Sequence, residues 1–220
     1  MHKKNSDNST PIFLIIVGNI ASGKSTATNI LAKALKIPFI EADLLFQTTN
    51  PYREDFLSDM SRWALANELW MTVNRVKILK NYAQENGSNV VLVDSGLLMS
   101  WVYTFAHQSD GVLDQRDWSL YQQLFSTIAQ DFNRNIRVLH LDYSIPTLLE
   151  RVARRGREYE LQYYTAHYLS SLNRGIGELV KSLKKQSIPV QRISEEKISD
   201  FEHDDEQQKE FVKVVQQFSR

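Results

Sequence analysis

Eight consecutive residues near the N-terminus have the types and spacing of a phosphate-binding loop. Residues 18–25 read Gly-Asn-Ile-Ala-Ser-Gly-Lys-Ser. The two glycines permit a tight turn whose backbone N–H groups converge on an anion, and a helix that begins there directs its positive end toward the same point. Lys24 would place its charge beside the β- and γ-phosphates, and the Ser25 hydroxyl would bind Mg²⁺. The pattern therefore predicts a nucleoside triphosphate site.

The segments on either side of this loop are the ones that the motif requires. Residues 12–17 are apolar and rich in β-branched types, as in a strand buried on both faces of a parallel sheet. Residues 26–35 carry apolar side chains at helical spacing and stop before Pro38. Strand, loop and helix in this order separate a phosphate loop from a chance match.

Acidic residues follow several of the other predicted strands. Strands are expected at residues 38–41, 90–93 and 136–141, and ligands of parallel sheets bind at the carboxyl ends of the strands. Phosphoryl transfer to an alcohol needs a carboxylate base and a bound metal. Glu41 or Asp43 could be that base, and Asp94 could hold Mg²⁺ opposite Ser25. For Asp142 a helix cap or a loop position is the favoured interpretation.

A cationic cluster follows the next predicted helix, which has Ser144 as its cap and Pro146 in its first turn. The cluster comprises Arg151, Arg154, Arg155 and Arg157. Such a helix end is often only a solvated face that complements the helix dipole. Because the chain also has a phosphate loop, we favour a role in neutralising the transferred phosphoryl group.

Strand and helix patterns alternate along the remainder of the chain, which predicts an α/β fold. Residues 1–10 are expected to be a flexible tail, residues 11–220 a single domain, and residues 44–52 a loop. The sheet is predicted to have five parallel strands with helices on both faces. The fifth strand is predicted at residues 188–193. The remaining helices are predicted at residues 63–79, continuing to about 87, and at 118–132, 164–183 and about 211–218. Asp114 or Asp117 is expected to cap the helix at 118–132.

The composition excludes several classes of protein. Lys plus Arg and Asp plus Glu are equal at 26 each, so no basic field indicates a nucleic-acid partner. There is no cysteine, which excludes disulfides and thiolate metal sites. No apolar segment approaches the roughly 20 residues needed to span a bilayer. We therefore expect a cytoplasmic protein that binds neither membranes nor nucleic acid.

Several motifs together resemble the deoxynucleoside kinase family, and the resemblance extends over nearly the whole chain. They are the loop at 18–26, Asn-Pro-Tyr at 50–52 followed by Arg62-Trp63, the lid sequence from Arg151 through Arg155-Gly156-Arg157 to Glu160, and Ser199-Asp200-Phe201. The resemblance implies a three-layer P-loop fold with an arginine-rich lid, ATP and Mg²⁺ as cofactors, a nucleoside acceptor and a homodimer.

The resemblance also implies a role for individual residues. Glu41 takes the position of the general base and Asp94 that of the acid near Mg²⁺. Glu160 takes the position of the acid that binds the sugar 3′-hydroxyl, and Arg75 that of an arginine near the nucleobase. Lys24, Arg151, Arg155 and Arg157 would act on the phosphates. The residues expected to bind ATP are Gly18, Asn19, Ile20, Ala21, Ser22, Gly23, Lys24, Ser25, Thr26 and Phe201.

This chain departs from the family pattern mainly on the acceptor side. Ser95 replaces the arginine that holds the general base and the 5′-oxygen, and Glu68 replaces the glutamine that reads the nucleobase. The other departures are Ala42 for a proline, Leu57 for a tyrosine and Ser100 for an acid. A carboxylate at Glu68 can only accept hydrogen bonds, which favours the adjacent donors of guanine.

These departures leave more than one interpretation open. The first is a nucleoside kinase with altered acceptor specificity. The second is a P-loop kinase of another small-molecule alcohol. The third is a nucleotide-binding protein with little catalysis.

Overall fold

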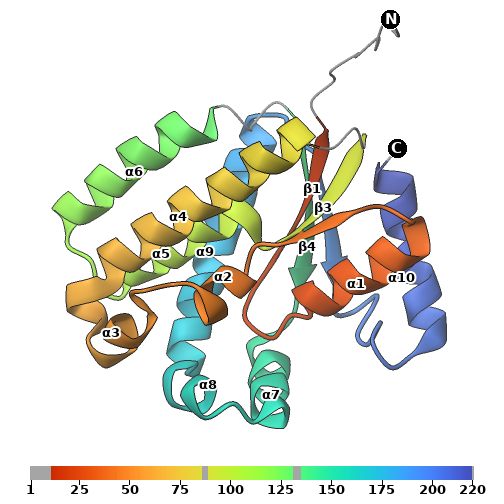
Figure 1. Cartoon of the computed structure of the whole chain (residues 1–220). Helices are drawn as coiled ribbons and strands as arrows, with labels where there is room; N and C mark the ends of the chain where they lie inside the picture. The colour runs from red at the N-terminus through yellow and green to blue at the C-terminus, as the bar shows by residue number, and fades with distance from the viewer. Residues whose placement is uncertain (1–10, 86–88, 131–134, 220) are drawn as a thin grey trace, which may run out of the picture.

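The computed structural model describes residues 11–85, 89–130 and 135–219, and in this part of the chain five parallel strands form one sheet (Figure 1). The strand order is β2-β3-β1-β4-β5. Parallel register pairs Ile16 with Asp94 and Glu41 with Asp94, so the carboxyl ends of β1, β2 and β3 meet at one edge. The strands are β1 (Ile12–Gly18), β2 (Phe39–Glu41), β3 (Val90–Asp94), β4 (Ile136–Asp142) and β5 (Val190–Ser194).

Helices cover both faces of this sheet. One face carries α1 (Lys24–Leu35) and α10 (Asp205–Ser219), which pack on each other. The other face carries α4 (Met60–Glu85), α5 (Gly96–Ser109), α6 (Gln115–Ala129) and α9 (Ala166–Lys185). Four shorter helices lie toward the carboxyl ends of the strands: α2 (Leu44–Thr48), α3 (Arg53–Ser58), α7 (Ile145–Arg155) and α8 (Glu158–Tyr163). The predicted three-layer α/β architecture is confirmed.

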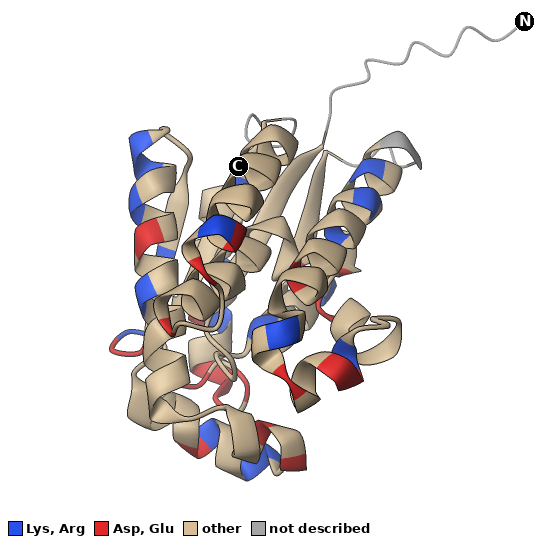
Figure 2. Ribbon diagram, turned by 90° about the vertical axis from the view of Figure 1, so that its left-hand side faces the viewer, with Lys and Arg blue, Asp and Glu red and all other residues tan. Residues whose placement is uncertain are grey.

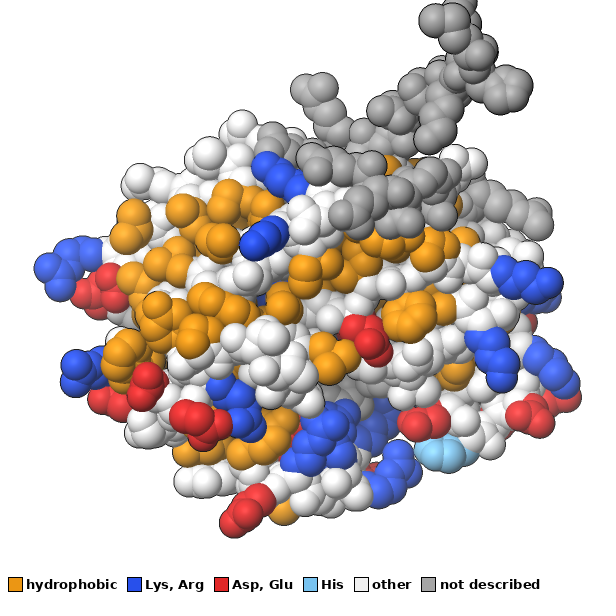
Figure 3. All heavy atoms as spheres, in the orientation of Figure 1, with side chains coloured by type: hydrophobic (Ala, Val, Ile, Leu, Met, Phe, Trp, Pro, Cys, Tyr) orange, Lys and Arg blue, Asp and Glu red, His pale blue; other side chains and the backbone are white. Residues whose placement is uncertain are grey.

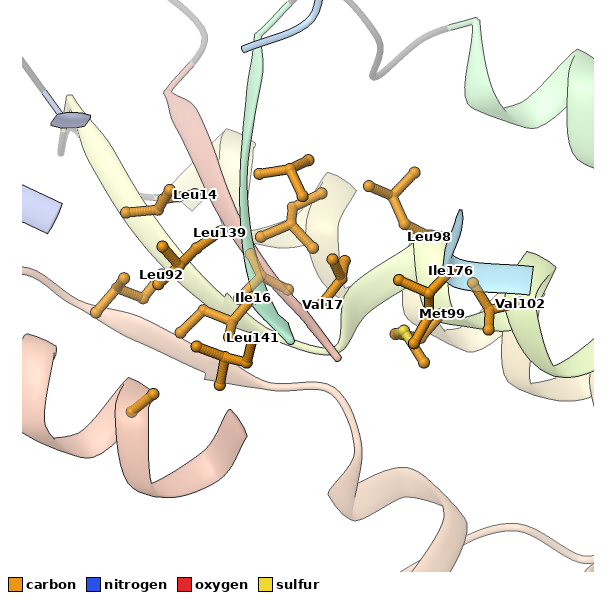
Figure 4. Close-up of a cluster of buried hydrophobic side chains, with 14 of the residues drawn as sticks. Leu14, Ile16, Val17, Leu92, Leu98, Met99, Val102, Leu139, Leu141 and Ile176 are labelled. Carbon is orange, nitrogen blue, oxygen red and sulfur yellow. The ribbon is translucent and has the colours of Figure 1, made fainter. Parts of the chain in front are cut away.

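The core fills the space on both sides of the central strands. Leu14, Ile16 and Leu139 lie together on one side, whereas Met99 and Ile176 lie on the other side with α5 and α9 (Figure 4). All five side chains are buried, which is typical of a parallel sheet covered on both faces. The core therefore fixes the positions of the strand ends that carry the acidic residues.

Helix α5 packs directly on α9 at a glycine. A Cβ added at Gly175 would lie 3.0 Å from Phe105 Cδ1 and 3.2 Å from the Val102 carbonyl oxygen. Only a residue without a side chain therefore permits this approach of the two helices.

Two segments differ from the sequence-based expectation. Residues 44–52 were expected to form a loop, but the first part of that segment is helix α2, so this prediction was wrong. Helix α5 was not predicted, because most of its side chains are buried and its sequence has no polar face from which to recognise a helical period.

Most of the other predicted elements appear within a few residues of the expected bounds. Asp114 and Ser144 are the side-chain caps of α6 and α7. The predicted helix from residue 164 is α9, which is preceded by the separate short helix α8. The tail at 1–10, Gly87 and Phe132 lie outside the described residues.

Charges of both signs are interspersed along the helices (Figure 2). This arrangement agrees with the net charge of zero. Within the described ranges, no helix has both the length and the apolar character needed to cross a bilayer.

Candidate active site

The phosphate loop connects β1 to α1 in a conformation that depends on its glycines. A Cβ at Gly18 would lie 2.5 Å from Ser22 Oγ and 2.9 Å from the Leu141 carbonyl oxygen. Gly23 has a φ of +88°, which an L side chain rarely adopts, and no side chain caps α1 there. The first N–H groups of α1 are therefore available to an anion.

Asn19, the asparagine after the first glycine, anchors the loop to α9. Its Nδ2 donates to the Leu169 carbonyl oxygen at 2.8 Å and to Asn173 Oδ1 at 2.6 Å, and its Oδ1 accepts from the Ile20 N–H at 2.7 Å. The side chain is 2 % exposed. Asn19 thus attaches the loop to α9, and its side chain does not line the cavity.

Three side chains at the start of α1 and the end of β3 form a compact polar group. Lys24 Nζ donates to the Asn19 carbonyl oxygen at 3.0 Å, and Ser25 Oγ donates to Asp94 Oδ2 at 2.5 Å. Burial lowers the pKa of Lys24, although Asp43 and Asp94 oppose this effect. Burial also raises the pKa of Asp94, with the nearby Asp43 carboxylate adding to the rise.

Ser95, at the position of the family arginine, is fully buried next to this group. It has a φ of +66°, and its Oγ donates to Asp94 Oδ1 at 3.2 Å. Its hydroxyl therefore contacts the carboxylate that the arginine would accompany.

A cavity of about 500 Å³ opens from the loop between β2, α4, α5 and the lid. It brings together most of the residues singled out from the sequence. Those that line it are Ile20, Ala21, Gly23, Lys24, Ser25, Thr26, Glu41, Asp43, Glu68, Arg75, Asp94, Arg155, Arg157 and Glu160. A cavity of this volume with the phosphate loop among its lining residues can hold a small-molecule ligand.

Five of the expected site residues lie outside this lining, namely Gly18, Asn19, Ser22, Arg151 and Phe201. The Arg151 guanidinium lies 4.1 Å from the centre of the Tyr143 ring, and its NH2 donates to the Ser199 carbonyl oxygen at 2.7 Å. Phe201 is 3 % exposed, and its ring packs 4.6 Å from that of Phe211. Arg151 NH1 also donates to the Ala21 carbonyl oxygen at 3.5 Å, and the Phe201 ring lies next to Gly23, so both side chains contact the phosphate loop.

The lid residues converge on one buried carboxylate. Arg155 and Arg157 donate to Glu160 Oε1 at 3.1 and 3.0 Å, and the Tyr159 hydroxyl donates to the same oxygen at 3.2 Å. Glu160 is 2 % exposed, so its charge is compensated by these donors. The lid thus carries cations and a carboxylate at one wall of the cavity.

The buried Arg75 binds Asp43, which follows β2, and Ser100 on α5. Its NH2 donates to Asp43 Oδ1 and its NH1 to Ser100 Oγ, both at 2.8 Å. The Asp43 carboxylate is therefore engaged in an ion pair, whereas Glu41 is exposed at the edge of the same cavity.

A chain of amides orients Glu68 on α4. Asn50 Nδ2 donates to Asn67 Oδ1 at 2.7 Å, and Asn67 Nδ2 donates to Glu68 Oε1 at 2.9 Å. Glu68 is 4 % exposed and lines the cavity. The Asn-Pro-Tyr segment thus positions the Glu68 carboxylate in the cavity wall.

Several aromatic residues that line the cavity were not predicted from the sequence. They include Tyr103 and His107 on α5 and Tyr168 on α9. Burial raises the pKa of both tyrosines well above its usual range, so their hydroxyls stay protonated. Since α5 itself was not predicted, only the prediction of that helix would have revealed its two cavity residues.

Comparison with known proteins agrees with this geometry. The model of the deoxynucleoside kinase family matches residues 14–220. The chain belongs to the deoxynucleoside kinase family. It is therefore a nucleoside kinase, and the phosphate loop described above is the P-loop of that family.

The relatives of this kinase differ in the nucleoside for which they are named. Deoxyadenosine/deoxycytidine kinase of Bacillus subtilis is 29 % identical over 157 residues, which cover 68 % of each chain. Deoxyguanosine kinase of the same organism is 23 % identical over 178 residues, covering 80 % of this chain and 82 % of the relative. Among solved structures, deoxyadenosine kinase from M. mycoides with bound dATP superposes with a TM-score of 0.74 at 22 % identity, covering 94 % and 97 % of the two chains. That structure shares the fold.

Proposed function

We propose that this kinase transfers the γ-phosphoryl group of ATP to the 5′-hydroxyl of a deoxynucleoside and that it favours a guanine-type base. The observation that carries the proposal is a single cavity with Lys24 and Ser25 of the P-loop at one wall and the buried Glu68 carboxylate at another. The bound nucleoside would lie between them, with its 5′-hydroxyl toward the P-loop.

Glu41 is the proposed general base. It pairs in register with Asp94 at the carboxyl edge of the sheet and is not held in the ion pair that engages Asp43. The Arg75 guanidinium, which binds Asp43, would supply near the reacting end a positive charge that Ser95 lacks.

Mg²⁺ fits the donor set beside the P-loop. Ser25 and Asp94 supply a hydroxyl and a carboxylate, and Mg²⁺ prefers one or two such protein oxygens together with phosphates and water. The described residues contain no cluster of three or more acidic or histidine side chains that would hold a metal without the nucleotide. When bound, the metal would neutralise charge on the phosphates.

Glu68 determines the preferred base in this proposal. A carboxylate accepts two hydrogen bonds from the adjacent N1–H and 2-amino groups of guanine, whereas an amide offers one donor and one acceptor. Replacing Glu68 with Gln should lower the ratio of kcat/KM for deoxyguanosine over deoxyadenosine by roughly tenfold or more. Glu178→Gln makes the same chemical change on the exposed side of α9 and should leave this ratio unchanged. An unchanged ratio in Glu68→Gln would refute the assignment.

The kinase is also proposed to form a homodimer. Apolar side chains gather over α4 and α6 on the face shown in Figure 3, and Val73 and Leu120 on these helices are 51 % and 54 % exposed. An apolar surface of this kind is typical of a protein contact. Light scattering should give twice the chain mass, and Leu120→Glu should reduce it.

A further inference from the structure

His107 lines the cavity and has a buried ring nitrogen without a hydrogen-bond partner in the described part of the chain. The residue is on α5 and 1 % exposed, and its Nε2 has no hydrogen-bond partner among the described residues. The nearest acidic atom is Glu68 Oε1 at 3.6 Å, which is too long for a hydrogen bond. Buried polar atoms are rarely left unpaired, so an unpaired nitrogen in the lining of a ligand cavity indicates a ligand contact.

The imidazole ring is held in one orientation by its neighbours. The Phe56 ring meets it edge-on at 5.5 Å and 70°, and the Tyr168 ring stacks at 6.0 Å and 23°. The backbone carbonyl of His107 accepts from the N–H groups of Val112 and Leu113 at 2.8 and 3.1 Å, which fixes the end of α5. Nε2 therefore stays beside Glu68.

The nearby carboxylate favours one of the two neutral tautomers of the imidazole ring. Nitrogen Nε2 is a donor in the protonated ring and in one of the two neutral tautomers. A carboxylate oxygen at 3.6 Å favours the tautomer with the proton on Nε2. His107 thus has one N–H donor next to the acceptor oxygens of Glu68.

We propose that His107 is a specificity-determining residue that donates from Nε2 to the 6-oxo oxygen of a guanine base. This inference rests on the proposed function, in which Glu68 accepts from N1–H and the 2-amino group. The edge of guanine presents an acceptor followed by two donors, which matches the donor of His107 and the two oxygens of Glu68 in order. Glu68 Oε1 already accepts a hydrogen bond from Asn67, but a carboxylate oxygen accepts more than one hydrogen bond and can also bind the nucleobase.

Other bases match this wall less completely. Adenine offers one donor beside one acceptor, and cytosine one donor beside two acceptors, so each uses at most two of the three protein atoms. Thymine offers an acceptor on each side of its single donor, so its second acceptor would face a carboxylate oxygen. Hypoxanthine keeps the oxygen and N1–H but lacks the amino group. The expected order is guanine, then hypoxanthine.

The test compares deoxynucleosides that differ at the atom that His107 would contact. The probes are deoxyguanosine, deoxyinosine and 2-aminopurine deoxyriboside, which lacks the 6-oxygen and with it the N1–H. His107→Phe should lower kcat/KM for the first two by about tenfold, the value of one hydrogen bond. The third should change by less than about twofold, because it has no oxygen for His107 to contact. His107→Gln keeps a donor and should restore part of the loss, whereas His167→Phe, on the exposed imidazole of α9, should change none of the three.

A second measurement uses the unchanged protein and does not depend on the folding of a variant. With ¹⁵N-labelled histidine, the Nε2 signal that is lost in His107→Phe or His107→Gln should shift on addition of deoxyguanosine and not on addition of 2-aminopurine deoxyriboside. Two results would overturn the role of His107 without affecting the proposed function. One is an equal fall in kcat/KM for all three nucleosides in His107→Phe, and the other is an Nε2 signal that shifts equally with deoxyguanosine and 2-aminopurine deoxyriboside. If the unchanged protein phosphorylates no nucleoside, both the inference and the proposed function are wrong.

Discussion

Replacing Asp94 with Asn should stabilise the fold while removing catalysis. Asp94 is 2 % exposed, and burial together with the Asp43 carboxylate raises its pKa. Its ionised form is thus less favourable in the folded than in the unfolded chain, so ionisation lowers stability as the pH rises through the folded-state pKa. A tenfold change in acid dissociation corresponds to about 1.4 kcal/mol. We expect Asp94→Asn to raise the free energy of unfolding at pH 8 by the equivalent of this pKa shift, measured by guanidinium titration in metal-free buffer.

The same substitution should slow phosphoryl transfer by on the order of a hundredfold, because the proposed Mg²⁺ ligand beside Ser25 is lost. The stability gain should shrink as the pH falls toward 4, where the aspartate of the unfolded chain is also protonated. Asp142→Asn is the matched control: this carboxylate ends β4 and pairs with Arg192 at 2.6 Å on the surface. It should leave activity unchanged. A destabilised Asp94→Asn protein, or one that keeps full activity, would refute the reasoning.

Two further predictions concern the base and the helix packing. Glu41→Gln should preserve ATP binding, measured by calorimetry, and abolish transfer; retained activity would instead make Asp43 the base. Gly175→Ala should lower the free energy of unfolding by about 1–3 kcal/mol because its Cβ would meet α5 at 3.0 Å. Gly177→Ala, on the same helix with nothing within 4 Å, should raise it by up to about 1 kcal/mol, and equal effects of the two substitutions would contradict this account.

The P-loop and the strand ends could be predicted because their signals are local. Residues 18–25 form a contiguous pattern, and β1 is a continuous apolar run. The parallel topology then places Glu41 and Asp94 at one edge without further information. Helix caps at Asp114 and Ser144 likewise depend on residues within one turn.

The acceptor side could not be predicted to the same depth because its contacts join segments distant in the sequence. Arg75 meets Asp43 on a different element, and no pattern in either segment indicates that pairing. His107 lies on a helix that is mostly buried, so its sequence lacks the alternation of apolar and polar faces. The packing of the Phe201 ring against Phe211 likewise joins two separate segments and could not be predicted from either one.

The most direct test of the central claim is ADP release by the purified protein with ATP·Mg²⁺ and a panel of deoxynucleosides, ribonucleosides and nucleoside monophosphates, with Lys24→Ala as the blank. We predict turnover with deoxynucleosides and the highest kcat/KM for deoxyguanosine. ATP binding without turnover of any acceptor would contradict the account, and would indicate that Ser95 in place of the family arginine leaves a nucleotide-binding site without catalysis.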